Sequence, residues 1–242
     1  MTMNHETQAR DLLAALPEVT EANLRALRGR LAERADAEEV LDVAYRTLDT
    51  PVGSLLLAAT EQGLVRVAYP VQGHDQVLES LAVQVSPRIL NAPARLDAAA
   101  RQIDEYFAGR RRAFDLLLDF SLSRGFRRTV LGHLPDIAYG HTASYAVVAA
   151  AAGRPRAVRA VGTACATNPL PVVVPCHRVI RSDGSLSGYA GGPAAKQALL
   201  TLEEAAMSEP VGRGAAWTEE RGASDEGRRR HKAPPRRAGD TA

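Results

Sequence analysis

The sequence predicts an α/β protein of the α+β kind, with a small antiparallel sheet and helices in the first half and a helical second half. Three short runs rich in Val, Leu and Tyr, at residues 41–47, 53–59 and 63–69, are separated by turn signals and are typical of strands in a meander. After residue 120, capping and terminating residues instead delimit successive short helices.

Length and composition fit a globular protein. The chain has 242 residues, of which 45% are apolar and 24% charged, enough for one or two domains with a core. No apolar stretch approaches ~18 residues, so no membrane span is expected. The polar first ten residues lack the apolar core of a signal sequence, so we expect a cytoplasmic protein. Its two cysteines, Cys165 and Cys176, are then expected to stay reduced, and no Cys/His spacing predicts a metal site.

Residues 1–40 read as a helical extension. Thr20 is a suitable N-cap for its longer helix, and a shorter helix is expected before Pro17. Three leucines share one face of the longer helix: Leu24, Leu27 and Leu31. We expect this extension to pack against the rest of the domain or against a partner.

Helices follow the strands of the first half. They are predicted over residues 76–84 and 95–107, and the second one ends at Gly109. Residues 114–118 fit either a short strand or an extended linker. The first domain therefore covers residues 41–120.

In the second half, a helix is predicted over residues 126–137. Ser144 can cap another that runs to about residue 152, and a third covers residues 156–166. Two helices joined by a short turn containing Gly153 have the form of a helix-turn-helix, although any helical hairpin would fit. This second domain covers residues 121–206. The Gly-, Ala-, Pro- and Arg-rich residues 207–242 are expected to be a disordered tail.

The charge distribution favours a polyanionic partner. Residues 137–182 contain no Asp or Glu. Five arginines lie in this window: Arg154, Arg156, Arg159, Arg178 and Arg181. A solvated arginine face would also fit, but an arginine surplus without acidic residues is typical of phosphate contact.

Residues 168–180 carry the chemistry. Three valines at 172–174, flanked by prolines, predict a buried, extended segment that ends just before Cys176. His177 and Arg178 follow directly, and a thiol in such a setting is expected to favour the thiolate. Cys176 alone would fit a small buried residue equally well.

The Pro-Cys-His-Arg sequence does not stand alone. The accompanying residues, in chain order, are Tyr139, Gly140, Thr142, Ser144, Tyr145, Gly153, Pro155, Arg159, Gly162, Asn168, Pro169, residues 187–192, Lys196, Leu199, Leu200 and Glu203. This set closely resembles the O6-alkylguanine-DNA alkyltransferase family of direct-reversal DNA repair proteins. The resemblance is dense over residues 126–203 and looser before them.

The resemblance implies a ribonuclease H-like α/β domain followed by a catalytic, DNA-binding domain with a helix-turn-helix. It also implies a single-turnover methylated-DNA–protein-cysteine S-methyltransferase, which moves the alkyl group of O6-alkylguanine, and of O4-alkylthymine, irreversibly to Cys176. No cofactor or metal is expected. The expected partner is double-stranded DNA carrying O6-alkylguanine, flipped out and bound mainly through the minor groove by a monomer. A non-catalytic lesion-binding protein and a helix-turn-helix regulator are the alternatives.

The resemblance also assigns roles within the catalytic group. Glu203 would orient His177, which would link to Cys176 through water. The hydroxyl group of Tyr145 would approach guanine N3 as a donor. Asn168 is expected to brace the turn before the cysteine through side chain–backbone hydrogen bonds.

Other residues are expected to bind the base or the DNA. By the resemblance, Tyr189 lines the lesion pocket, the carbonyl groups of Cys176 and Val179 bind the exocyclic amine, and the Ala190 N–H binds O6. Arg159 would fill the place of the flipped base. The remaining expected substrate or DNA contacts are Ser144, Arg178 and Lys196, the last in a supporting role.

Overall fold

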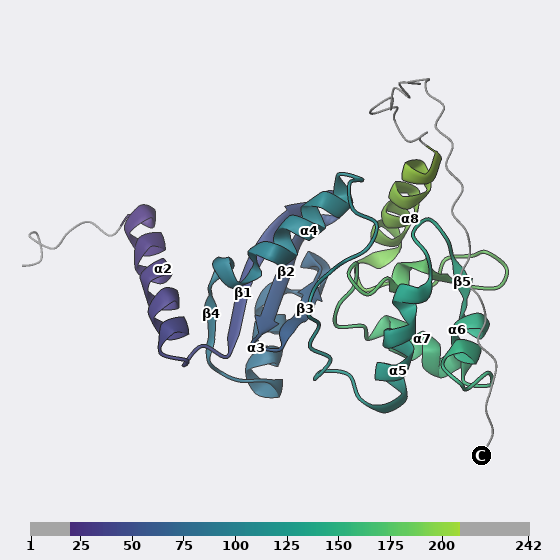
Figure 1. Ribbon diagram of the computed structural model, residues 1–242, viewed down its shortest axis with the longest axis horizontal. Helices are drawn as coiled ribbons and strands as arrows, with labels where there is room; N and C mark the ends of the chain where they lie inside the picture. The colour runs from purple at the N-terminus through teal and green to yellow at the C-terminus, as the bar shows by residue number, and fades with distance from the viewer. Residues whose placement is uncertain (1–19, 209–242) are drawn as a thin grey trace, which may run out of the picture. The chain divides into compact units, whose positions relative to one another are not determined.

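A four-stranded sheet and a group of short helices make up residues 20–208, which the computed structural model describes (Figure 1). The prediction of a helix before Pro17 lies outside the described residues, as does most of the predicted tail. The tail begins later than predicted, because residues 207 and 208 still belong to the last helix.

Helix α2 (Glu21–Ala37) begins as predicted, because the Thr20 side chain accepts a hydrogen bond from the first turn. The predicted leucine face, however, is not the face that packs. Leu27 and Leu31 are 52% and 56% exposed. The buried residues of the helix are Ala32 and Ala35. Alanine faces the protein here, and the longer leucine side chains lie outside the core.

The predicted antiparallel meander is confirmed. It consists of β1 (Val43–Thr50), β2 (Gly53–Thr60) and β3 (Gly63–Ala68). A fourth strand, β4 (Ile89–Asn91), pairs with β1 in parallel, so the sheet is mixed, in the order β3-β2-β1-β4. A strand of three residues is too short to show the alternation that predicts strands.

The two faces of β2 are both covered, as its apolar sequence requires. Leu55 and Leu57 belong to the core that includes α4 (Asp97–Phe107). Leu56 and Ala58 belong to a smaller core that includes α3 (His74–Gln84). Alternate side chains of one strand thus anchor a helix on each face of the sheet.

The expected strand or linker at residues 114–118 is an extended segment along the edge strand β3. The N–H of Leu64 donates to Leu117 O over 2.9 Å, and Leu64 O accepts from the N–H of Asp119. Further along the same edge, the Val67 N–H donates to Pro169 O over 2.8 Å. Both segments therefore tie the second half of the chain to the sheet.

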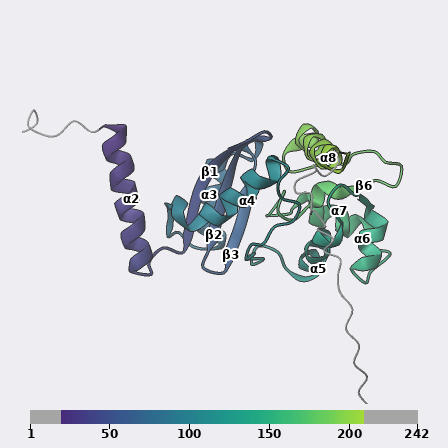
Figure 2. The same ribbon diagram turned by 45° about the horizontal axis from the view of Figure 1, so that its top comes forward.

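In the second half, α5 (Gly125–His133), α6 (Tyr145–Ala151) and α7 (Val158–Ala166) pack on one another (Figures 1 and 2). Helix α5 ends earlier than predicted, because Pro135 lies in a 3-10 turn that follows it. Ser144 caps α6 as predicted, accepting from the Val147 N–H over 3.3 Å. Helix α8 (Gly192–Ser208) completes the fold.

A two-stranded sheet joins the start of α6 to the segment after the cysteine. Strand β5 (Ala143–Ser144) pairs in parallel with β6 (Val179–Ile180), with Ser144 opposite Ile180. This pairing fixes Tyr145, the first residue of α6, beside the cysteine turn.

The valine segment before Cys176 is buried but not extended, so the predicted strand there is wrong. Residues 171–173 form a turn, closed by a hydrogen bond of 2.8 Å from the Val174 N–H to Leu170 O. Val172 has a φ of 73°, which a β-branched residue adopts only when its surroundings require it. Those surroundings include Asn168, whose amide spans the turn.

Candidate active site

Cys176 opens the 3-10 turn η4 (Cys176–Arg178) and is only 2% exposed. The amide of Asn168 donates from Nδ2 to Cys176 Sγ over 3.1 Å and to Val174 O over 2.8 Å. Its Oδ1 accepts from the Leu170 N–H over 3.0 Å. These bonds confirm the expected bracing of the turn, and they also place a donor on the sulfur.

Glu203, from α8, lies at the centre of a buried network. Its Oε1 accepts from His177 Nε2 over 2.8 Å and from the Tyr106 hydroxyl over 2.8 Å, while Oε2 accepts from the Gly140 N–H over 3.0 Å. Arg178 donates to both oxygens. Burial would raise the pKa of this carboxyl group, but the hydrogen bonds from His177 and Arg178 and the charge of Arg178 outweigh it and lower the pKa to about 2. The carboxylate therefore stays ionised.

The ionised Glu203 sets the tautomer of His177. Burial lowers the pKa of the imidazole, so it is neutral near pH 7. Because a carboxylate only accepts, Nε2 carries the proton, and this assignment leaves Nδ1 with a free lone pair. Nδ1 is buried and has no hydrogen-bond partner within residues 20–208. His177 therefore has one ring nitrogen that can accept a proton.

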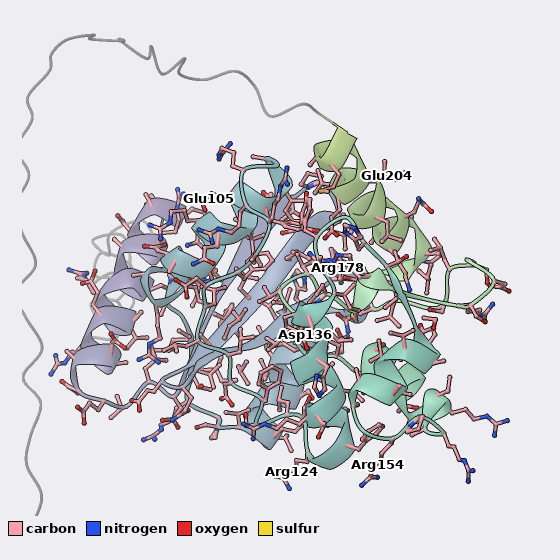
Figure 3. The ribbon with its side chains drawn as sticks, turned by 45° about the vertical axis from the view of Figure 1, so that its right-hand side comes forward. Glu105, Arg124, Asp136, Arg154, Arg178 and Glu204 are labelled. Atoms are coloured by element: carbon pink, nitrogen blue, oxygen red, sulfur yellow. The ribbon has the colours of Figure 1, made fainter. Side chains whose placement is uncertain are left out.

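The placement of Arg178 does not fit the expected contact with DNA. Its side chain is 7% exposed, and it donates to Glu203 and, from Nη1, to Ile137 O over 2.7 Å. Its guanidinium group also lies over the ring of Tyr139, 5.6 Å from the centroid. Figure 3 shows it in the interior. Arg178 therefore holds Glu203 in place, and the arginine surface is smaller than predicted.

The expectation that the resting thiol favours the thiolate is also corrected. Burial raises the pKa of Cys176 to about 11, and the Asn168 amide and the Lys196 charge offset only part of this. The guanidinium group of Arg178 points to Glu203 and not to the sulfur. A base must therefore remove the proton before the thiol reacts.

A second network joins Tyr145 to the loop beyond β6. The Tyr145 hydroxyl contacts Ser187 Oγ, and Lys196 Nζ donates to Ser187 Oγ over 3.1 Å and to Val179 O over 2.6 Å. Lys196 is 1% exposed, and burial lowers its pKa. A carbonyl oxygen has two lone pairs, so Val179 O can still accept a second bond.

Tyr189 lies between the thiol region and the sheet. Its hydroxyl lies 3.0 Å from the Tyr69 hydroxyl, and its ring packs edge-on against the rings of Tyr69 and His177. A Cβ atom on Gly191 would lie 2.6 Å from the Tyr69 ring, so only glycine allows this close packing. Ala190, between them, is partly buried.

Helix α7, the second helix of the predicted helix-turn-helix, presents arginine to solvent. Arg159 lies exposed on α7, and Arg154 and Arg156 lie exposed in the turn before it. Arg154 packs over the Phe126 ring, 5.1 Å from its centroid, and points outward together with Arg124 (Figure 3). Cys165, on the inner face of α7, is a buried free cysteine.

The sequence analysis assigned no role to several of the residues that complete the site. They are Tyr69, Tyr106 and Ser187. Both tyrosines come from the first half and reach the site only through tertiary contacts, whereas Ser187 belongs to the loop motif at residues 187–192, where a polar side chain beside Tyr189 was the available signal. Within residues 20–208, no group of His, Cys, Asp and Glu is arranged to hold a metal ion. No helix in the same range is long and apolar enough to cross a membrane.

Comparison with known proteins agrees with this site. Residues 125–205 match the model of the 6-O-methylguanine DNA methyltransferase DNA-binding domain, and residues 43–120 match that of its ribonuclease-like domain. The methylated-DNA–protein-cysteine methyltransferase of Methanosarcina barkeri is 38% identical over 160 residues, which is 66% of this chain and 96% of the relative. The constitutive enzyme of Bacillus subtilis is 40% identical over 166 residues, 68% and 98% of the two chains.

Solved structures give the same result. The O6-methylguanine methyltransferase of Mycobacterium tuberculosis superposes with a TM-score of 0.60 at 38% identity, covering 70% of this chain and 96% of that one. A complex of the same organism's protein with DNA gives 0.57, covering 67% and 94%.

A fold of this kind, with a buried Cys–His–Glu group beside a helical DNA-binding domain, defines a DNA alkyltransferase. The chain belongs to the 6-O-methylguanine DNA methyltransferase family. It is therefore a methyltransferase of direct-reversal DNA repair with DNA as its partner, and the non-catalytic alternative is not favoured.

Proposed function

We propose that Cys176 is the acceptor of the alkyl group, and that His177, held by Glu203, is its base. This proposal rests on the buried imidazole of His177, the residue after Cys176. Its Nε2 is bound to Glu203, and its Nδ1 has no partner within residues 20–208. The thiol proton passes to Nδ1, through a water molecule. The sulfur then attacks the alkyl carbon, and the bond between that carbon and O6 breaks.

The leaving guanine must be stabilised as negative charge develops on it. We assign this role to the Tyr145 hydroxyl as donor to N3 and to the Ala190 N–H as donor to O6. The proton on the imidazolium returns to the departing base, so the balance closes with a thioether and neutral guanine. The carbonyl groups of Cys176 and Val179 accept from the exocyclic amine, and Tyr189 lines the pocket. Asn168 supports the sulfur through the 3.1 Å contact.

The substrate we propose is O6-alkylguanine, together with O4-alkylthymine, in double-stranded DNA. A base within a duplex cannot reach a thiol that is 2% exposed, so the nucleotide must be flipped out, at a cost of a few kcal/mol. Arg159, exposed on α7, is assigned to the place that the base vacates. A repair protein must act on lesions in any sequence context, which favours binding through phosphates and the minor groove. We propose that the protein does so as a monomer in the cytoplasm.

Intact mass of the full chain after incubation with O6-methylguanine DNA tests this proposal. We expect the mass to rise by one methyl group per protein and then to stop, with the label on the peptide that contains Cys176. The Cys176→Ala variant should take up no methyl group and still bind duplex DNA, while Cys165→Ala serves as the matched control and should react fully. A label on Cys165, or continued turnover, would contradict the assignment.

A further inference from the structure

A polar cavity lies away from the alkyl-transfer site, between α3, strand β3 and the residues that follow α7. Its volume is about 350 Å³, within the range of small-molecule sites. The residues that matter here are Arg66, Gln76, Ser80, Gln84, Arg127 and Thr167. None of them belongs to the alkyl-transfer site described above.

Arg66 is the unusual member of this cavity. It lies on the edge strand β3, its Nε is buried, and no hydrogen bond or ion pair joins its side chain to another residue within 20–208. Burial lowers the pKa of its guanidinium group, because nothing there compensates the charge. A partly buried charge without a counter-ion is costly, and a bound anion would reduce that cost.

The other walls are also suited to an anion. Arg127, on α5, brings a second guanidinium group, held by Thr167 Oγ1 over 3.5 Å and by Leu122 O. Along α3, three polar residues recur at intervals of four and share one face: Gln76, Ser80 and Gln84. Among residues 20–208, no carboxylate lines the cavity.

We propose that this cavity binds a phosphate group, with Arg66 and Arg127 as its charged contacts and the polar face of α3 as its hydrogen-bonding wall. Two guanidinium groups offer planar, forked donors that match phosphate oxygens. The phosphate group belongs either to a free anion or to the backbone of bound DNA. This site goes beyond the alkyl transfer proposed above, and its residues take no part in that step.

Thermal unfolding of the full chain tests the free anion, with inorganic phosphate compared with chloride at equal pH and ionic strength. Phosphate should raise the Tm of the wild-type protein, and Arg66→Gln should lose this rise. In chloride, Arg66→Gln should melt no lower than wild type, because Arg66 has no partner to lose. Arg101→Gln, an exposed arginine on α4 with 69% of its side chain accessible, is the matched control and should keep the full rise.

The salt dependence of duplex binding tests the DNA backbone as the source. If a DNA phosphate enters the cavity, Arg66→Gln should reduce the slope of log K against log salt by roughly one unit, and Arg101→Gln should not. If the ligand is a free anion, that slope is unchanged and only the thermal shift is lost. A loss specific to Arg66 in either arm supports the site, whereas no such loss in both arms overturns it. Neither arm measures alkyl transfer, so failure here leaves the proposed repair reaction untouched.

Discussion

The hydroxyl oxygens of Tyr69 and Tyr189 lie 3.0 Å apart, although 120 positions separate them in the chain. Tyr69 follows the last strand of the meander, and Tyr189 belongs to the loop beside the cysteine turn. The sheet thus supports the loop that we assign to base recognition. Contacts of this kind make the first half of the chain part of the site.

The packing of Gly191 on Tyr69 gives a first prediction. Gly191→Ala should destabilise the fold by about 1–3 kcal/mol, because the added methyl group would lie 2.6 Å from the ring. In a Tyr69→Ala background the same change should cost much less, as denaturant unfolding of the single and double variants will show. Gly188→Ala, which has no atom within 4 Å of the new Cβ, is the control. Additive costs would mean that the ring is not the obstacle.

Tyr106 gives a second prediction, because it donates to Glu203 over 2.8 Å. Tyr106→Phe should lower the free energy of unfolding by about 1–3 kcal/mol, since a buried carboxylate loses a donor. The pKa of Glu203 should rise from about 2, so the stability that its ionised form provides should be lost at a higher pH as the solution is acidified.

Tyr139→Phe is the matched control for this experiment. The Tyr139 hydroxyl is buried but has no hydrogen-bond partner within residues 20–208, so its removal should cost little. Chemical denaturation between pH ~2 and 7 measures both variants. Equal losses in the two would show that the bond to Glu203 adds nothing.

The base assigned to His177 leads to a third prediction. His177→Ala and Glu203→Gln should each slow alkyl transfer by roughly 10²–10⁴-fold, the usual contribution of a general base. The double variant should be no slower than the worse single variant, because the two residues act as a unit. Single-turnover rates on duplex DNA measure this, with the exposed neighbour Glu204→Gln as control. If the rate losses of the two single variants multiplied in the double variant, the two residues would act independently.

The raised pKa of Cys176 gives a fourth prediction. In a Cys165→Ser background, the rate of iodoacetamide labelling of the folded protein should rise about tenfold per pH unit up to pH ~10, without levelling. In denaturant it should level above pH ~8.5, where an ordinary thiol is ionised. Because the folded pKa is raised to about 11, the stability that the neutral thiol provides is complete below pH ~8.5 and is lost as the pH rises through 11. Levelling near pH 8 in the folded protein would contradict the burial argument.

Arg159 gives the last prediction. If it replaces the flipped base, Arg159→Ala should slow repair of duplex DNA far more than the reaction with free O6-benzylguanine, and Arg159→Lys should recover only part of the rate. Arg156→Ala, three residues earlier, should instead weaken binding and reduce its salt slope by roughly one unit. Equal loss on both substrates would mean that Arg159 supports the pocket and does not fill the stack.

How far the sequence predicts this protein depends on the range of the contacts. The meander, the Ser144 cap and the link between Asn168 and the cysteine turn rest on local patterns, and each was predicted. The valines at 172–174 were misread as a strand, because their β propensity gave no sign of the Asn168 amide that closes them into a turn.

The remaining errors concern tertiary contacts. Arg178 faces a buried carboxylate and not solvent because Glu203, 25 positions away in the chain, lies beside it. The same holds for Tyr106, which reaches Glu203 across 97 positions. Leu27 and Leu31 follow a helical period, but that period does not say which face of α2 meets the sheet. Local patterns place the reacting residues, and the folded chain decides their protonation states.

The burial of the cysteine sulfur has a consequence for the lifetime of the protein in a damaged cell. Each molecule can react once, and the small electrophiles and oxidants that damage DNA also attack thiolates. A sulfur that is 2% exposed and carries its proton is a poor target for them. The alkyl carbon reaches the sulfur only when an alkylated nucleotide is flipped into the pocket. Burial and protonation thus keep the one reactive thiol of each molecule unmodified until a lesion enters the pocket.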